Sequence, residues 1–197
     1  DAYGQDYQLN EGDGAFYGPK IDLHIRDALN RTWQCGTIQL DMSLPERFNL
    51  YYIDKDNEKH RPIMIHRTVF GSIERFLGIL IEHFAGKFPL WLSPLQAIIL
   101  PINDELVPYA DEVLATLKNA GLRAEVDSRT ESLNKKVREA QLQYIPLILT
   151  IGGKEKEAST LSVRTLDGNV KYGVSHETFL NTVQSHIRNR ELSLEFV

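Results

Sequence analysis

Residues 62–84 constrain the fold most, because they combine an extended run, a tight turn and an amphipathic helix. Six apolar side chains recur at helical spacing and form one stripe, typical of a helix packed on a core: Ile73, Phe76, Leu77, Leu80, Ile81 and Phe84. Ser72 stands at the N-cap position, and Arg75 follows in the first turn. The positive end of the helix dipole disfavours a guanidinium there, and an anionic ligand would remove that penalty. The sequence therefore predicts a site for a negatively charged ligand at this turn.

The region before this helix has the pattern of antiparallel strands. Apolar and polar residues alternate along residues 21–26, a turn follows at 28–31, and residues 32–40 run back as the second arm of a hairpin. Short strands are also expected at 50–53 and 62–68, separated by a polar turn at 54–61. Ser43 and Glu46 have the spacing of a capping box, which predicts a short helix with Pro45 in its first turn.

The region after residue 94 alternates strands and helices instead. Residues 86–94, with two prolines, read as the linker between the regions. The expected elements are a strand at 97–102, a helix at 105–119 ended by Gly121, a strand at 122–126, a helix at 133–143, a strand at 146–151, a hairpin at 161–174 about Asp167-Gly168, and a last helix capped by Ser175. This order predicts a parallel or mixed sheet covered by helices. Residues 152–154 are expected to form a turn, because the Gly-rich phosphate-loop pattern is missing.

Charge and composition exclude several functional classes. The net charge is −5, which argues against a protein that coats nucleic acid by bulk electrostatics. No apolar run approaches the ~20 residues that a membrane-spanning helix needs. The single cysteine, Cys35, excludes an intrachain disulfide and an all-cysteine metal site, and it suits a reducing compartment. The chain opens at Asp1 without an initiator Met, so we expect a fragment or a processed product.

Polar residues on the expected strands are candidates for ligand contacts. Lys20 follows a Gly-Pro turn, where its ammonium could hold a phosphate; an ordinary turn with a solvated lysine is the alternative. Gln34 and Gln39 are five residues apart and would face opposite sides of a regular strand, unless Gly36 marks a β-bulge that rotates one of them. His66 lies in an apolar run, which is typical of a hydrogen-bonded histidine as well as of a ligand.

Basic side chains form two clusters in the second region. Their members are Arg129, Lys135, Lys136 and Arg138 in one, and Lys154, Lys156 and Arg164 in the other. Glu131 and Glu155 interleave with them, and carboxylates can read base edges as acceptors. The alternative is a pair of solvated faces with ion pairs worth little.

Three blocks of this chain resemble threonyl-tRNA synthetase. They are residues 14–20 (GAFYGPK), 33–41 (WQCGTIQLD) and the segment that runs from His66-Arg67 to Gly71-Ser72-Ile73-Glu74-Arg75-Phe76. The resemblance implies an α/β (α+β) fold: the antiparallel-sheet part of a class II catalytic domain at 1–90, followed by a mixed-sheet α/β anticodon-binding domain at 94–197.

The resemblance also implies roles for individual residues. Lys20 and Arg75 would be catalytic, and Lys20, Gln34, Ser72 and Arg75 would bind ATP. Tyr17, Gln39 and His66 would hold threonine, with His66 one of three ligands to a zinc ion that selects Thr over Val. Arg129, Glu155 and Arg164 would contact the anticodon.

The implied function is a threonine–tRNA ligase, which activates threonine with Mg²⁺–ATP and transfers it to tRNA(Thr). The complete enzyme would be a homodimer without membrane contact, cytoplasmic or organellar, with one Zn²⁺ per subunit. The family's other two zinc ligands and its first two class II motifs have no counterpart in this chain. We therefore expect that the chain alone neither binds zinc tightly nor makes an adenylate, and elemental analysis tests the first point. The alternatives are a tRNA-binding or regulatory module without catalysis, and a soluble α/β domain in which Arg75 and Lys20 are surface charges.

Overall fold

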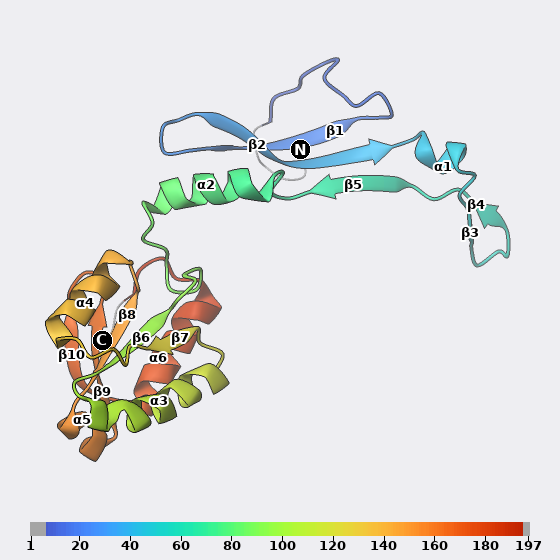
Figure 1. Ribbon diagram of the computed structural model, residues 1–197. Coiled ribbons are helices and arrows are strands. Elements are labelled where there is room, and N and C mark those ends of the chain that lie inside the picture. The colour runs from blue at the N-terminus through green and yellow to red at the C-terminus, as the bar shows by residue number, and fades with distance from the viewer. Residues whose placement is uncertain (1–6, 195–197) are drawn as a thin grey trace. The chain divides into compact units, whose positions relative to one another are not determined.

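The computed structural model describes residues 7–194, and the chain divides into two compact units between His83 and Phe84 (Figure 1). The first unit is built on an antiparallel sheet and the second on a mixed sheet covered by helices. Both architectures agree with the expected fold class. No helix among the described residues is long and apolar enough to cross a membrane.

The sheet of the first unit has three strands in the order β1-β2-β5. The elements of this unit are β1 (Lys20–Arg26), β2 (Thr32–Asp41), α1 (Leu44–Arg47), β3 (Tyr52–Ile53), β4 (Lys59–His60), β5 (Met64–Thr68) and α2 (Ile73–Phe84). The hairpin, the short helix and the strand-turn-helix segment are confirmed. The polar turn expected at 54–61 is wrong in one respect, because its last part pairs with β3 as a second small hairpin.

The cap of α1 differs from the predicted capping box. The Ser43 side chain makes no capping hydrogen bond. Instead Asp41 Oδ1 accepts the backbone N–H groups of Ser43 and Leu44 at 2.8 and 2.9 Å. Asp41 ends β2 just before the helix, so its carboxylate reaches these two N–H groups, of which that of Ser43 is the one the capping box would have paired with Glu46.

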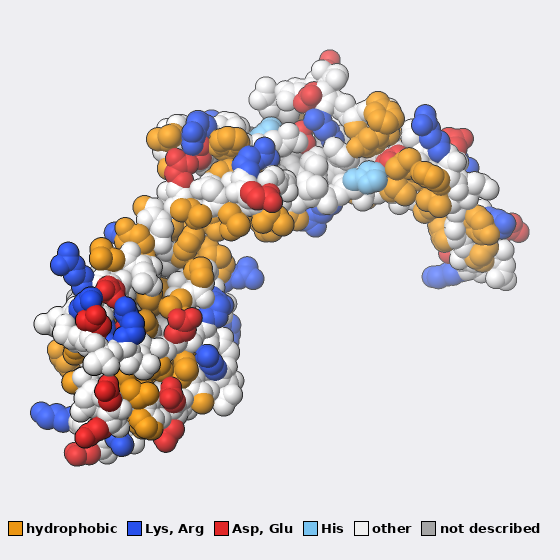
Figure 2. All heavy atoms as spheres, in the orientation of Figure 1, with side chains coloured by type: hydrophobic (Ala, Val, Ile, Leu, Met, Phe, Trp, Pro, Cys, Tyr) orange, Lys and Arg blue, Asp and Glu red, His pale blue; other side chains and the backbone are white. Residues whose placement is uncertain are grey.

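Helix α2 begins as predicted, because Ser72 Oγ accepts the backbone N–H of Arg75 at 3.4 Å. Its apolar stripe is not buried, however. Ile73, Leu77 and Ile81 are 64%, 48% and 51% exposed, and the buried residue of the helix is Ile79. Periodicity fixes the amphipathic helix, but within the described part of this unit no second layer covers that face. Figure 2 shows apolar side chains at the surface of this unit along α2 and around β3–β4.

The second unit has a five-stranded sheet in the order β10-β9-β8-β6-β7. Its elements are β6 (Ala97–Pro101), a 3₁₀ turn (Asp104–Leu106), α3 (Val107–Asn119), β7 (Ala124–Val126), α4 (Leu133–Leu142), β8 (Leu147–Ile151), α5 (Gly153–Ala158), β9 (Thr160–Thr165), β10 (Val170–Ser175) and α6 (His176–Asn189). Strand β6 is parallel to β7 and β8, while β9 and β10 are antiparallel additions, so the sheet is mixed as expected.

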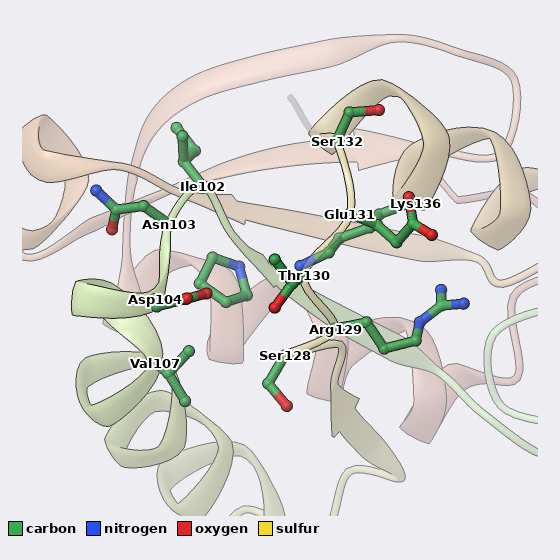
Figure 3. A pocket seen from close by; sticks show the side chains of 11 residues that line it. Ile102, Asn103, Asp104, Val107, Ser128, Arg129, Thr130, Glu131, Ser132 and Lys136 are labelled. Carbon is green, nitrogen blue, oxygen red and sulfur yellow. The ribbon is translucent and has the colours of Figure 1, made fainter.

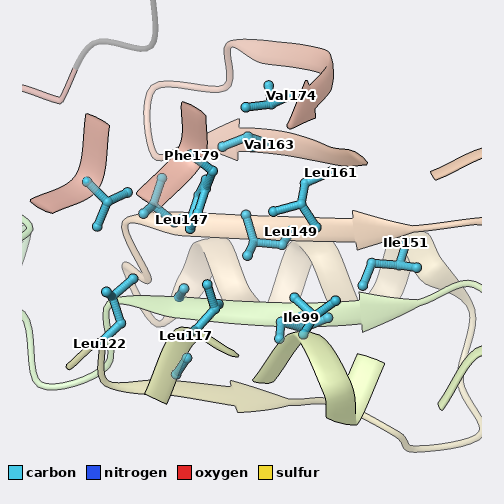
Figure 4. Packing of buried hydrophobic residues seen from close by; sticks show 14 of the residues in the cluster. Ile99, Leu117, Leu122, Leu147, Leu149, Ile151, Leu161, Val163, Val174 and Phe179 are labelled. Carbon is cyan, nitrogen blue, oxygen red and sulfur yellow. The ribbon is translucent and has the colours of Figure 1, made fainter. Parts of the chain in front are cut away.

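Each face of this sheet packs against different helices. On one face of the sheet, the buried side chains of Ile99, Leu147 and Leu149 pack in one cluster with helices α3 and α6 (Figure 4). The helices contribute Val113 from α3 and Phe179 and Val183 from α6. Leu100 and Ile148, on the other face, pack with Ala140 of α4. Leu90, from the expected linker, is 3% exposed and belongs to the first of these clusters, so it anchors rather than spaces the chain.

The segment 152–154 is not the turn that the sequence predicts. Gly152 is the N-cap of α5, and its backbone N–H donates to Glu155 Oε2 at 3.0 Å. The glutamate three residues ahead therefore supplies the acceptor that stabilises the first helical turn.

Candidate functional site

A β-bulge at Cys35 decides which side chains of β2 share a face. Leu23 of β1 pairs with Gly36, but His24 pairs with Gln34, so Cys35 is one residue too many for a regular ladder. The bulge shifts the alternation of side chains between Gln34 and Gly36. The β-bulge expected at Gly36 is thus present, with the neighbouring Cys35 as the extra residue, and it puts Gln34 and Gln39 on one face. Cys35 itself is buried at 5% exposure.

The register places one polar face across the three strands, since directly paired residues point to the same side of a sheet. Its polar members are Lys20, Asp22, His24 and Arg26 from β1, Thr32, Gln34, Thr37, Gln39 and Asp41 from β2, and His66 and Thr68 from β5, with Met64 beside them. Five of the site residues predicted from the sequence lie on this face or at its edge. The opposite face is mainly apolar and also carries Arg67, which pairs with Ile38.

Asp22 gathers one end of this face. Its carboxylate lies 2.8 Å from Lys20 Nζ and accepts hydrogen bonds from Gln34 Nε2 at 2.7 Å and Thr37 Oγ1 at 2.8 Å. Asp13 lies 3.5 Å from the same ammonium. The hydrogen bond to Asp22 raises the pKa of Lys20, and the same bond lowers the pKa of Asp22. Lys20 and Gln34 are thus brought together around one carboxylate.

Tyr17, Gln39 and His66 form the other end of the face. The Tyr17 hydroxyl donates to Gln39 Oε1 at 2.6 Å, and its ring meets the His66 imidazole edge-on with centroids 5.8 Å apart. His66 Nε2 lies 2.8 Å from Asp41 Oδ2. The structure therefore makes neighbours of the three residues expected to hold an amino acid.

Arg75 is exposed but held against β2. Its Nη2 donates to the backbone carbonyl of Gln34 at 2.7 Å, and its guanidinium lies 5.7 Å from the centroid of the Trp33 ring. Gly71 has φ +65°, and a Cβ built on it would lie 2.9 Å from Arg75 Nη2. Glycine thus serves the turn twice, since it adopts the left-handed backbone and leaves room for the guanidinium. Ser72 Oγ, beside it, donates to Glu74 Oε2 at 2.8 Å.

A buried carboxylate fixes the tryptophan under Arg75. Asp27, whose side chain is fully buried, accepts the Trp33 Nε1–H at 2.7 Å and also binds Arg31, which reaches Glu82 of α2 at 3.1 Å. Burial raises the pKa of Asp27, but the hydrogen bonds from Trp33 and Arg31 outweigh it and lower the pKa to about 2. This network ties the hairpin turn to the helix that carries Arg75.

The second unit has a pocket of about 350 Å³ at the carboxyl ends of β6 and β7 (Figure 3). Its polar lining comes from the turn after β6, with Asn103 and Asp104, and from the turn after β7, residues 128–132. These turns lead to α3 and α4, which cover opposite faces of the sheet. A crevice where neighbouring connections diverge in this way is the usual ligand position in open α/β sheets.

The basic cluster beside this pocket is internally paired. Arg129 forms ion pairs with Asp127 and Glu139, each at 2.7 Å. Both hydrogen bonds raise the pKa of Arg129, that to Asp127 the more strongly. Lys136 is buried and donates to the Asp127 carbonyl at 2.9 Å. Arg129 therefore corresponds to the ion-paired alternative that the sequence left open, whereas the buried Lys136 does not lie on a solvated face.

Glu155 and Arg164 lie apart from the pocket lining, unlike Arg129. Glu155 accepts a hydrogen bond from Ser162 Oγ at 2.7 Å in addition to that from Gly152, and Arg164 Nη1 donates to the Gly168 carbonyl at 3.2 Å. The three residues predicted to contact an anticodon are therefore not gathered in one pocket.

Comparison with known proteins assigns both units. Residues 4–84 match the tRNA synthetase class II core domain (G, H, P, S and T), and residues 96–186 match the anticodon binding domain. A threonine–tRNA ligase from Desulfosudis oleivorans is 70% identical over 190 residues, which are 96% of this chain. Another, from Desulfatibacillum aliphaticivorans, is 68% identical over 194 residues, or 98% of this chain. The chain belongs to the threonyl-tRNA synthetase family.

A solved structure agrees with this assignment. The crystal structure of the RNA binding domain of threonyl-tRNA synthetase from Cryptosporidium parvum has 39% sequence identity and a TM-score of 0.82, covering 99% of this chain and 48% of that one. The chain spans about 30% of the length of the two curated relatives described above.

Sequence reasoning missed two carboxylates that organise the synthetase-like face. Asp22 and Asp41 stand two residues after Lys20 and Gln39 on the same strands, so the period-2 rule alone would have placed them beside these residues. It singled out Arg129, Glu131 and Lys136 of the pocket lining but missed Asn103, Asp104 and Ser128, whose signal is short polar residues directly after two buried parallel strands.

Metal ligation in the described residues rests on one side chain. Residues 7–194 contain no group of three or more His, Cys, Asp or Glu side chains that could hold a metal. His66 Nε2 lies 2.8 Å from Asp41 Oδ2, and within residues 7–194 no hydrogen bond or ion pair engages its Nδ1. His66 therefore fits a zinc site as a single donor.

Proposed function

We propose that this chain is the part of a threonine–tRNA ligase that holds Mg²⁺–ATP and threonine on its first unit and the anticodon loop on its second. The domains we propose are 1–90, the later part of the class II catalytic domain, and 94–197, the anticodon-binding domain. The observation that carries the proposal is the bulge at Cys35, because it gives the two glutamines a common face with Lys20 and His66.

The nucleotide end of this face would consist of Lys20, Gln34, Ser72 and Arg75. The Lys20 ammonium lies beside the Asp22 carboxylate, and a bound phosphate would compete with that carboxylate for the ammonium. Arg75 presents a planar guanidinium that can stack on adenine and contact phosphate oxygens. Gln34 offers an amide to ribose hydroxyls. The catalytic contribution of Lys20 and Arg75 would be neutralisation of the charge that builds on the phosphates as the threonine carboxylate displaces pyrophosphate. Mg²⁺ would accompany ATP.

The threonine end would consist of Tyr17, Gln39 and His66. The pairing of Tyr17 with Gln39 fixes both polar groups, which suits recognition of an amine and a hydroxyl. His66 would be one ligand of the zinc ion, with two further ligands from outside residues 7–194. The chemistry that zinc supplies is Lewis-acid coordination of the amino and hydroxyl groups, which rejects valine because it lacks the hydroxyl.

The second unit would bind the anticodon loop of tRNA(Thr) at the pocket after β6 and β7. Single-stranded bases are read by hydrogen bonds on their edges, and Asn103, Ser128 and Thr130 provide short neutral donors and acceptors there. Arg129, Glu155 and Arg164 remain proposed contacts. The complete protein would act as a homodimer in the cytoplasm or an organelle.

A second candidate function is tRNA binding without chemistry. The second unit closes its own core and carries a pocket, whereas the first exposes Ile73, Leu77 and Ile81 of α2. A chain of this kind could serve as a tRNA-binding or regulatory module.

Titration of the isotope-labelled chain with Mg²⁺–ATP, followed by NMR, separates the two functions. We expect the largest shift changes at Lys20, Gln34 and the turn before α2, and their loss in Lys20→Ala. Lys118→Ala, on α3 of the other unit, is the control. A chain that binds tRNA(Thr) but shows no ATP-dependent change on β1, β2 or the turn supports the second candidate and contradicts the first.

A further inference from the structure

Asp41 divides its two carboxylate oxygens between two tasks. Oδ1 accepts the backbone N–H groups of Ser43 and Leu44, while Oδ2 lies 2.8 Å from His66 Nε2. The side chain of Asp41 is fully buried, and that of His66 is 41% exposed.

This arrangement leaves His66 one choice of tautomer. An ionised carboxylate only accepts hydrogen bonds, so a neutral imidazole must place its proton on Nε2 to satisfy it. Nδ1 then keeps a lone pair. Because two backbone N–H groups at the start of α1 anchor Asp41 Oδ1, Oδ2 is held facing His66 Nε2.

We propose that Asp41 is the positioning residue of His66: it holds the imidazole in the Nε2–H tautomer and so makes Nδ1 the nitrogen available to a metal ion. The inference rests on the proposed function, in which His66 is a zinc ligand. A ligating histidine whose other nitrogen donates to a carboxylate has a fixed ring and a more basic donor atom. In this chain the carboxylate of Asp41 comes from β2 and the imidazole of His66 from the adjacent strand β5.

The substitution Asp41→Asn tests the division of tasks. An amide has one acceptor oxygen, and the two backbone N–H groups need it, because an NH₂ group cannot accept from them. The NH₂ group would then face His66 Nε2 and donate to it. The imidazole proton would move to Nδ1, and the lone pair that a metal needs would be lost. The comparable change in a serine-protease triad acts through the wrong tautomer in the same way.

The experiment is long-range ¹H–¹⁵N NMR of the histidine rings, recorded at about pH 8, where imidazoles are neutral. We expect His66 of the wild-type chain to be the Nε2–H tautomer and His66 of Asp41→Asn to be Nδ1–H. The matched control is Asp56→Asn, since Asp56 faces His60 Nε2 at the same 2.8 Å but in an exposed loop. It should leave His66 unchanged.

A wild-type His66 that is Nδ1–H, or an even mixture, would overturn the proposal without any variant, so a misfolded Asp41→Asn cannot leave it untested. An Asp41→Asn chain that folds and keeps the Nε2–H tautomer overturns it as well. The measurement needs neither ATP nor metal. Its failure is therefore distinct from failure of the proposed function, which would appear as absent ATP-dependent changes while the tautomer is as expected.

Discussion

The Gln34 side chain of β2 donates to Asp22 of β1 across a distance of 2.7 Å, and the extra residue Cys35 makes this bond possible. Without the bulge, Gln34 would point to the apolar face, away from Lys20. The extra residue Cys35 thus brings polar side chains of β1 and β2 to the same face of the sheet.

Asp22→Asn is expected to lower the pKa of Lys20 toward its ordinary value. The hydrogen bond from Lys20 to the Asp22 carboxylate is the main cause of the raised pKa, and an amide carries no charge to stabilise the ammonium. NMR titration of the Lys20 side chain measures the change. Lys135, whose pKa is raised by Glu131 in the other unit, is the internal control and should not move. An unchanged Lys20 pKa would contradict the pairing.

Acid should destabilise the first unit through Asp27. The pKa of this carboxyl is about 2 in the folded chain against an ordinary 3.8, so its stabilising contribution is complete above about pH 4 and is lost as the pH falls toward 2. Urea unfolding followed by Trp33 fluorescence in a Trp91→Phe background measures it. Asp27→Asn should weaken the unit at neutral pH and flatten the stability profile between pH 4 and 2. A variant profile that falls as steeply as the wild type would refute the assignment.

Arg75→Lys should weaken Mg²⁺–ATP binding by about tenfold or more, even though the charge is kept. An ammonium cannot stack on a ring or offer two parallel donors, so the planar contact is lost. Arg47→Lys, on the exposed surface of α1, is the matched control and should bind as the wild type does. Equal affinities for Arg75→Lys and the wild type would show that only charge matters at this turn.

Core truncations should separate the two units. Leu149→Ala removes a fully buried side chain from β8, and we expect a loss of about 2–5 kcal/mol in the unfolding free energy of the second unit. Leu77→Ala, on the exposed stripe of α2, should change the stability of the first unit by no more than about 0.5 kcal/mol. Domain-resolved hydrogen exchange measures both. A large loss in Leu77→Ala would mean that the stripe is covered.

Asn103→Ala is expected to change tRNA binding by the second unit, whereas Arg129→Ala is expected to change its stability. Asn103 lines the pocket without a hydrogen bond from its side chain among the described contacts, so its loss should reduce tRNA(Thr) affinity and leave stability unchanged. Arg129→Ala leaves the buried Asp127 without its main partner, and it should lower the unfolding free energy of the second unit. Filter binding and urea unfolding distinguish the two. An Asn103→Ala chain with full tRNA affinity would remove the pocket from the proposed interface.

The sequence was a good guide wherever the signal is local. Ser72 and Ser175 cap their helices as predicted, and Gly121 and Asp167-Gly168 end or turn their elements where expected. Ser43 makes no capping hydrogen bond, and Asp41, a residue of the preceding strand, accepts the first backbone N–H groups of the helix, those of Ser43 and Leu44. The exposure of Leu77 was equally out of reach, since periodicity reports an apolar side but not whether anything packs on it.

The sequence by itself determined the two units, nearly all of their helices and strands, and the residue types that mark this synthetase family. Turn chemistry, capping and hydrophobic period act over a few residues, so they can be read without a fold. Only the tertiary structure decided that Cys35 is the extra residue, that Asp22 holds Lys20 beside Gln34, and that Asp41 orients His66. Strand register and burial depend on partners distant in the sequence. A one-residue bulge changes which face of the sheet each later side chain of the strand points to.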